Sequence, residues 1–285
     1  MAILKQNHYG KSRVRLMRVT RHDERHEVRE WNVGLYLQGD FERCFVEGDN
    51  TGIMATDTMK NTVYSVAAES RAETMEGYAQ DLARLLTQRN PQVEHLRVSI
   101  EEKMWVRIRT VDGDVRTPDG SAFIQRGPEV ATTELELFPG LAPVVRSGVK
   151  GLVILKTSKS AFTGFKRDDW TTLPETIDRL MGTEATIVWT YSKLLGDYAA
   201  ARKRLLDCLL TSFAQHDSLS VQQTLFKMAE DALVCEPAVS ELALTMPNRH
   251  NLPVDLSKFG QANANQIFVP TDEPHGHIHA RVVRE

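Results

Sequence analysis

The sequence contains only three cysteines in 285 residues, Cys44, Cys208 and Cys235. They are widely spaced, odd in number and lack a Cys-x-x-Cys pair, which argues against a zinc knuckle and against a disulfide framework. Because disulfides are rare in reducing compartments, this sparse cysteine content favours a cytoplasmic protein.

Long apolar segments are also missing. No apolar run approaches the roughly 18 residues that a membrane-spanning helix requires. The first ten residues are polar and lack the apolar core of a secretory signal. The last four residues are Val-Val-Arg-Glu rather than a sequence ending in the peroxisomal address Ser-Lys-Leu. We therefore expect a cytoplasmic protein with no membrane segment.

An excess of positive charge is absent too. The sequence has 35 basic and 38 acidic residues, a formal net charge of −3, whereas dedicated nucleic-acid-binding proteins usually carry a basic excess. It has no GxGxxG, Walker P-loop, HExxH or GxSxG motif, which argues against the commonest nucleotide-binding, zinc-protease and serine-hydrolase classes. What remains is a globular composition, with 41% hydrophobic and 26% charged residues.

The first half of the sequence changes from strand-like to helix-like patterns and back. Trp31, Val33, Leu35 and Leu37 recur at every second position, which places them on one face of a strand. A later apolar stripe has helical spacing and is stopped by Asn90-Pro91. The predicted elements are strands at 13–20 and 31–38, a loop leading into a helix at 55–62, a helix at 75–86, and strands at 96–100, 104–108 and 121–137.

The second half repeats this order, although the two halves share no visible sequence identity. Its predicted elements are strands at 151–156 and 186–191, helices at 198–213 and 221–234, and strands at 241–246 and 277–283. We therefore predict an α+β fold of two domains, 1–140 and 141–285, each with an antiparallel sheet and helices on one face. The open edges of such sheets favour pairing with another copy of the chain.

Three histidines alternate near the end of the sequence, His275, His277 and His279. On a strand they would share one face, so a metal site is conceivable. The alternative interpretation is an exposed polar face of a terminal strand.

Five other stretches stand out, and each alone has a structural explanation such as a solvated lysine, a helix N-cap at Thr56 or Asp57, or a core phenylalanine. Together and in this order they resemble the urate oxidase (uricase) family over nearly the whole chain. The stretches are Tyr-Gly-Lys at 9–11, Ala-Thr-Asp-x-x-Lys-Asn-Thr at 55–62, Phe-x-Gly-Phe at 162–165 followed by Arg-Asp and Thr-Thr-Leu, Ser-Val-Gln at 220–222, and Pro-Asn-x-His at 247–250.

The resemblance implies two tandem tunnelling-fold (T-fold) domains of ββααββ order. It also implies a homotetramer that forms a barrel, active sites at subunit interfaces, and no cofactor or metal. The implied activity is oxidation of urate by O₂ and water to 5-hydroxyisourate and H₂O₂.

The resemblance also assigns roles to residues. Arg179 would bind the urate anion with its planar guanidinium, and Phe162 would stack on the purine ring. The other substrate-binding residues would be Gln222 through its amide, Val221 through its backbone, Thr56 and Asp57 from the neighbouring chain, and Asn248 above the ring, where O₂ or water is positioned.

Lys11, Thr56 and His250 would form a proton relay. Urate must lose a further proton before it can give an electron to O₂ at a useful rate. A desolvated lysine can serve as the base, and a hydroxyl can pass the proton on because it both donates and accepts.

Two alternatives keep part of this interpretation. One is a T-fold hydrolase that binds pterins or purines and uses zinc, which would need a Cys/His ligand set near the pocket. The other is a non-catalytic purine-binding protein, which would need Arg179, Gln222 and Phe162 but neither Lys11 nor His250.

Overall fold

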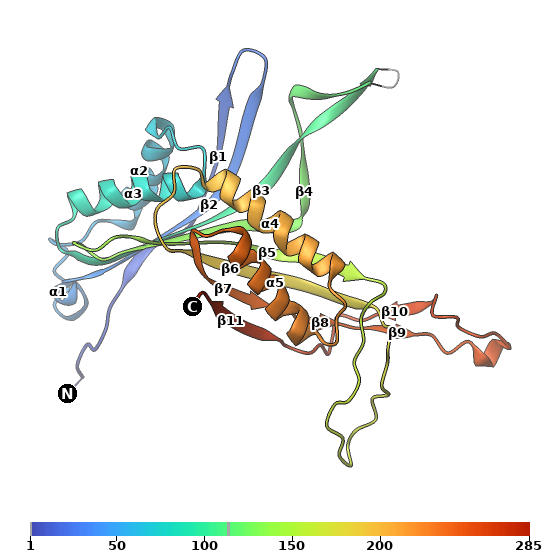
Figure 1. Cartoon of the computed structure of the whole chain (residues 1–285). Helices are drawn as coiled ribbons and strands as arrows, with labels where there is room; N and C mark the ends of the chain where they lie inside the picture. The colour runs from blue at the N-terminus through green and yellow to red at the C-terminus, as the bar shows by residue number, and fades with distance from the viewer. Residues whose placement is uncertain (1, 113–114) are drawn as a thin grey trace. The chain divides into compact units, whose positions relative to one another are not determined.

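The computed structural model describes residues 2–112 and 115–285, and the chain folds into two compact units (Figure 1). The first unit comprises Met1–Gly148 and Thr190–Tyr198, and the second comprises Val149–Trp189 and Ala199–Glu285. The division into domains at 1–140 and 141–285 stays a prediction.

The sheet of the first unit has four antiparallel strands in sequence order. They are β1 (Tyr9–Arg21), β2 (His26–Gly39), β3 (Val93–Asp112) and β4 (Val115–Leu137). The two strands predicted at 96–100 and 104–108 are wrong as separate elements, because β3 runs through both. The outer part of this strand lies beyond the buried core, which leaves Val106 and Ile108 exposed by 38% and 43%.

The core of the first unit lies between this sheet and two helices, α2 (Thr56–Glu69) and α3 (Met75–Arg89). The predicted alternation in β2 is confirmed, since Trp31, Val33, Leu35 and Leu37 are all at most 1% exposed. The indole of Trp31 stacks on Tyr78 of α3, with ring centroids 4.8 Å apart. A short helix, α1 (Glu42–Val46), precedes them.

The second unit contains β7 (Val239–Thr245), β11 (His279–Val283) and most of β5 (Val144–Lys156) and β6 (Met181–Tyr191), and these strands are neighbours in the order β5, β6, β7, β11. A two-residue strand, β8 (Asn248–Arg249), pairs with β6. The remaining short elements are β9 (Asn251–Pro253), the 3₁₀ turn η1 (Ser257–Phe259) and β10 (Phe268–Pro270), and β9 pairs with β10.

Two helices, α4 (Tyr198–Gln215) and α5 (Val221–Cys235), complete the second unit, and α5 packs on β7 and β11. Cys208 of α4 and Cys235 of α5 form a disulfide, with Cα atoms 6.7 Å apart. The expectation that the cysteines stay unpaired is therefore wrong. The tertiary packing of two helices brings together residues 27 positions apart, which no spacing rule reveals.

The antiparallel strands and the helices that pack on them confirm the α+β class. Within the described residues, no helix is both long enough and apolar enough to cross a lipid bilayer.

Candidate functional site

The predicted site residues fall into two groups that belong to different units. Lys11, Thr56 and Asp57 lie in the first unit, and the second unit holds Phe162, Arg179, Val221, Gln222, Asn248 and His250.

Lys11 lies on β1 directly opposite Leu35 of β2. Directly opposed residues of antiparallel strands share a face of the sheet, so Lys11 lies on the face that buries Leu35. Gly10 permits this close pairing, since a Cβ there would come within 1.9 Å of the Leu35 carbonyl oxygen. A bulge follows between Lys11 and Val14, with Arg13 at a φ of 59°. A bulge changes the direction of the neighbouring side chains, and bulges are common next to functional sites.

Thr56 and Asp57 begin helix α2, but neither caps it. Ala55 is the N-cap residue and provides no side-chain hydrogen bond, so the cap prediction for Thr56 or Asp57 is wrong. The first helical bond runs from the Met59 amide to the Ala55 carbonyl, at 3.1 Å. The amides of the residues before Met59 therefore precede the helical ladder, and a helix N-terminus of this kind favours a negatively charged partner.

The Asp57 carboxylate is held by its own helix. Lys60 donates to it at 2.5 Å and Asn61 at 3.1 Å. The hydrogen bond from Lys60 is the main reason why the pKa of Asp57 is lowered, and the charge of Lys11 contributes in the same direction. The first unit thus brings the Lys11 ammonium within electrostatic reach of the start of α2.

In the second unit, backbone hydrogen bonds pair residues 159–162 with other segments on two sides. On one side, Phe162 exchanges backbone hydrogen bonds with Thr176 at 2.7 and 3.1 Å, and the Arg179 amide donates to the Ser160 carbonyl at 2.9 Å. On the other side, Ser218 exchanges bonds with Ala161 and Lys159 at 2.8 and 2.9 Å. Phe162 and Arg179 are therefore fixed next to the segment that leads into α5.

The side chain of Arg179 lies against the ring of Phe162, with its guanidinium carbon 5.1 Å from the ring centroid. Burial lowers the pKa of Arg179. Among the described residues, no hydrogen-bond acceptor reaches its buried Nε. A buried guanidinium N–H without an acceptor is costly, so this pair is suited to bind a flat anionic ligand.

Val221 and Gln222 form the first turn of α5. Ser220 is the N-cap residue, and its hydroxyl accepts from the Gln223 amide at 3.1 Å. Ser218 has a buried hydroxyl that accepts from Thr224 Oγ1 at 2.7 Å, which ties this turn to the 159–162 segment with which Ser218 is paired. Val221 is buried, whereas Gln222 is exposed and free to meet a ligand.

Asn248 and His250 lie on either side of Arg249. Asn248 pairs with Thr183 of β6, and the backbone N–H of Asn248 donates to the Gly276 carbonyl at 2.8 Å. The His250 carbonyl accepts from the Thr271 amide at 2.8 Å.

Arg249 makes two ion pairs, with Glu184 of β6 at 3.3 Å and with Asp272 at 2.5 Å. It thereby anchors the segment that carries Asn248 and His250. Sequence reasoning assigned no role to Arg249 or Ser218, because their partners are distant in sequence. The only available signal was their position inside or beside the quoted motifs.

The histidine run does not form the predicted shared face, because only His279 lies on β11. His279 Nδ1 lies 2.9 Å from Thr245 Oγ1, and His275 Nδ1 lies 3.0 Å from the Asp272 carbonyl. The described part of the chain has no group of three or more His, Cys, Asp or Glu side chains placed to hold a metal.

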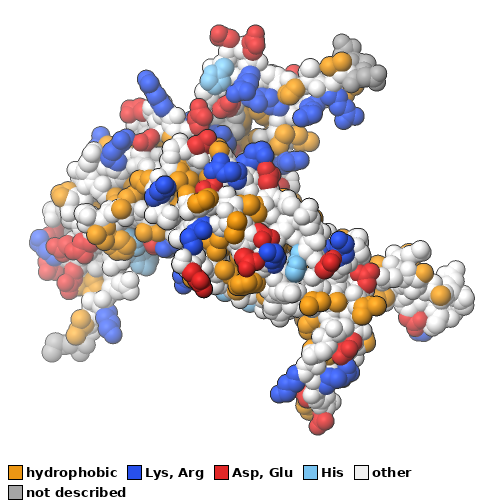
Figure 2. All heavy atoms as spheres, viewed as in Figure 1, with side chains coloured by type: hydrophobic (Ala, Val, Ile, Leu, Met, Phe, Trp, Pro, Cys, Tyr) orange, Lys and Arg blue, Asp and Glu red, His pale blue; other side chains and the backbone are white. Residues whose placement is uncertain are grey.

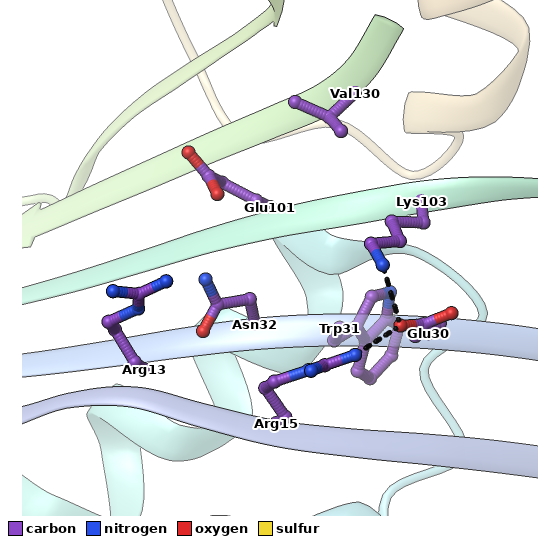
Figure 3. Close-up of a pocket in the computed structure, with 8 residues that line it drawn as sticks. All are labelled: Arg13, Arg15, Glu30, Trp31, Asn32, Glu101, Lys103 and Val130. Atoms are coloured by element: carbon purple, nitrogen blue, oxygen red, sulfur yellow. Dashed lines mark hydrogen bonds and ion pairs between the residues drawn. The ribbon is translucent and has the colours of Figure 1, made fainter. Parts of the chain in front are cut away.

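A cavity of about 260 Å³ lies over the sheet of the first unit and includes none of the predicted site residues (Figure 3). Glu30 accepts there from Arg15 at 3.0 Å and pairs with Lys103 at 3.3 Å, as the dashed lines show. Trp105 donates to the other carboxylate oxygen at 3.0 Å. Because these partners neutralise Glu30, we interpret the cluster as structural.

Comparisons with known proteins agree with the motif pattern. The sequence model of the uricase family matches residues 7–136 and 145–279. The chain is 38% identical to the uricase of Arthrobacter globiformis over 99% of its length and 90% of that protein. It is 36% identical to the uricase of Dictyostelium discoideum over 100% of its length and 98% of that protein.

The fold comparison points the same way. The crystal structure of the Arthrobacter globiformis uricase superimposes with a TM-score of 0.93 and 38% identity, covering 100% of this chain and 96% of that one. The resemblance predicted from the motifs is therefore confirmed, and the chain belongs to the uricase family.

Proposed function

We propose that the chain catalyses urate + O₂ + H₂O → 5-hydroxyisourate + H₂O₂. The observation that carries the proposal is the Arg179–Phe162 pair, in a chain that matches uricases over almost its whole length. The Phe162 ring, and a guanidinium whose buried Nε meets no acceptor among the described residues, suit a planar, anionic heterocycle.

In this proposal the second unit binds the purine. Phe162 stacks on the ring, and Arg179 donates to neighbouring oxygen and nitrogen acceptors. The Gln222 amide and the Val221 backbone meet another edge of the purine. Asn248 lies over the ring, where O₂ or water is positioned. The network through Ser218 supports this arrangement, because it holds the 159–162 segment and the first turn of α5 together.

The first unit supplies the proton transfer. Lys11 acts as the base, the Thr56 hydroxyl passes the proton, and His250 completes the relay. The loss of a proton gives an electron-rich purine dianion, which can donate an electron to O₂. The backbone N–H groups of Thr56 and Asp57, at the start of α2, complete the purine contacts.

The assembly we propose is a homotetramer of tandem T-fold subunits that forms a barrel, with each site built at an interface between two chains. In support, among the described strands β1 pairs only with β2 and β11 only with β7. Apolar side chains are exposed along the 163–178 loop (Figure 2), with Trp170 90% and Ile177 85% exposed. Open edges and exposed apolar patches of this kind usually mark association surfaces.

The proposed chemistry uses neither metal nor organic cofactor. A zinc hydrolase is disfavoured, because Cys208 and Cys235 are paired with each other and the described residues include no group of three or more His, Cys, Asp or Glu side chains placed to hold a metal. A non-catalytic purine-binding protein is disfavoured by the uricase relatives.

The test is the loss of urate absorbance in the ultraviolet, together with peroxide release, before and after treatment of the purified protein with a chelator. We expect the same turnover in both samples. A strict requirement for added metal or flavin would contradict the proposal.

A further inference from the structure

Tyr9 connects the two elements that carry Lys11 and Thr56. It lies two residues before Lys11 on β1, directly opposite Leu37 of β2, and therefore shares the Lys11 face of the sheet. Its hydroxyl accepts a hydrogen bond from the Met54 amide at 3.0 Å. Met54 lies two residues before Thr56, so this single bond ties the strand of the base to the start of α2.

The phenol of Tyr9 is held rigidly. Its ring packs edge-on against Phe41, with centroids 4.8 Å apart and an interplanar angle of 88°. Phe41 itself is only 2% exposed. Burial raises the pKa of Tyr9, so its hydroxyl stays neutral and hydrogen-bonded.

Within the described residues, no side-chain hydrogen bond caps the start of α2, where Ala55 is the N-cap residue. The preceding loop is held by the bond from Gln92 Nε2 to the Gly52 carbonyl, at 2.8 Å. A second tyrosine link, from the Tyr64 hydroxyl to the Arg15 carbonyl at 3.4 Å, is longer and lies two turns further along the helix.

We infer that Tyr9 is a positioning residue for proton transfer, because its hydroxyl sets the geometry between Lys11 and the Thr56 hydroxyl. The inference rests on the proposed function, in which these two groups form the relay. Displacing reacting groups by about 1 Å can cost up to about 10²-fold in rate. Tyr9 therefore acts on turnover, while the Arg179–Phe162 pair of the second unit continues to bind the purine.

The test compares Tyr9→Phe with the matched control Tyr64→Phe. Each variant removes one hydroxyl that links β1 to the α2 region and keeps the ring. We expect Tyr9→Phe to lower kcat by about 10- to 10²-fold, with little change in the binding of a urate analogue and a shifted pH profile of kcat. Tyr64→Phe should keep kcat within about twofold. Equal losses in both variants would overturn the inference, since general loosening of α2 would then explain them.

A double-mutant cycle separates this inference from the proposed relay. In the Lys11→Met background, measured at high enzyme concentration, Tyr9→Phe should have no further effect, because its target is gone. An equal loss in both backgrounds would show that Tyr9 acts independently of Lys11 and would refute the positioning role. If Lys11→Met itself kept the wild-type kcat, the relay would fail, whatever Tyr9→Phe did in the wild-type background.

Discussion

Mixing two inactive variants tests whether one site takes its parts from two chains. Lys11→Met damages only the group in the first unit, and Arg179→Gln damages only the group in the second unit. Alone, Lys11→Met should lower kcat by about 10²- to 10⁴-fold while it retains analogue binding, as expected for loss of a general base. Arg179→Gln should chiefly weaken binding, because it leaves the anion without its charged partner.

The fraction of activity that the mixture recovers follows from how the site residues are divided between two chains. If every site combines the first unit of one chain with the second unit of its neighbour, an equal mixture assorts the two units at random. About one site in four then receives an intact Lys11 together with an intact Arg179. We expect the co-refolded mixture to regain about a quarter of the wild-type activity per site, measured by the ultraviolet urate assay.

The matched control is a mixture of Lys11→Met with Thr56→Ala. Both changes lie in the first unit, so every site carries one damaged residue and no recovery is expected. If the Lys11→Met and Arg179→Gln mixture also stayed inactive, each chain would build its own site, and the interface assembly would be wrong. Recovery in both mixtures would point to a refolding artefact and would leave no support for shared sites.

Two further predictions concern charged residues. Burial alone would raise the pKa of Glu30, but hydrogen bonds from Arg15, Trp105 and Lys103 outweigh it and lower the pKa. The carboxylate therefore stabilises the fold above about pH 4, and this contribution is lost as the pH falls through the lowered pKa. Glu30→Gln should cost about 1 kcal/mol at pH 7 and flatten the acid limb of stability in urea unfolding; an unchanged acid limb would contradict this. Arg249→Met, which breaks the pairs with Glu184 and Asp272, should lower kcat about tenfold by displacing Asn248 and His250. The matched control Arg281→Met breaks the exposed pair with Glu241 and should leave kcat unchanged; equal effects of the two would contradict the anchoring role.

Local periodicity was sufficient to identify most elements. The alternation at Trp31, Val33, Leu35 and Leu37 identified β2 and its buried face, because a strand places every second side chain on one side. The stripe at 75–86 identified α3. The family also followed from the sequence alone, since the motif residues stand at matching places along the chain.

Other features depended on contacts between residues far apart in sequence. β3 became one long strand because β4 pairs with it past the buried core. Cys208 of α4 and Cys235 of α5, 27 residues apart, form a disulfide that the spacing of the cysteines does not indicate.

The sequence by itself determined the chemistry available to this protein, that is, the lysine, hydroxyl, imidazole, guanidinium and amide groups and their order along the chain. Only the tertiary structure decided how those groups are combined. It placed Lys11 and Thr56 in one unit and Arg179 against Phe162 in the other, and it linked Tyr9 to the Met54 amide. The physical reason is that side-chain type and periodicity are local properties, whereas a stacking contact or a hydrogen bond across 45 residues exists only after the chain has folded.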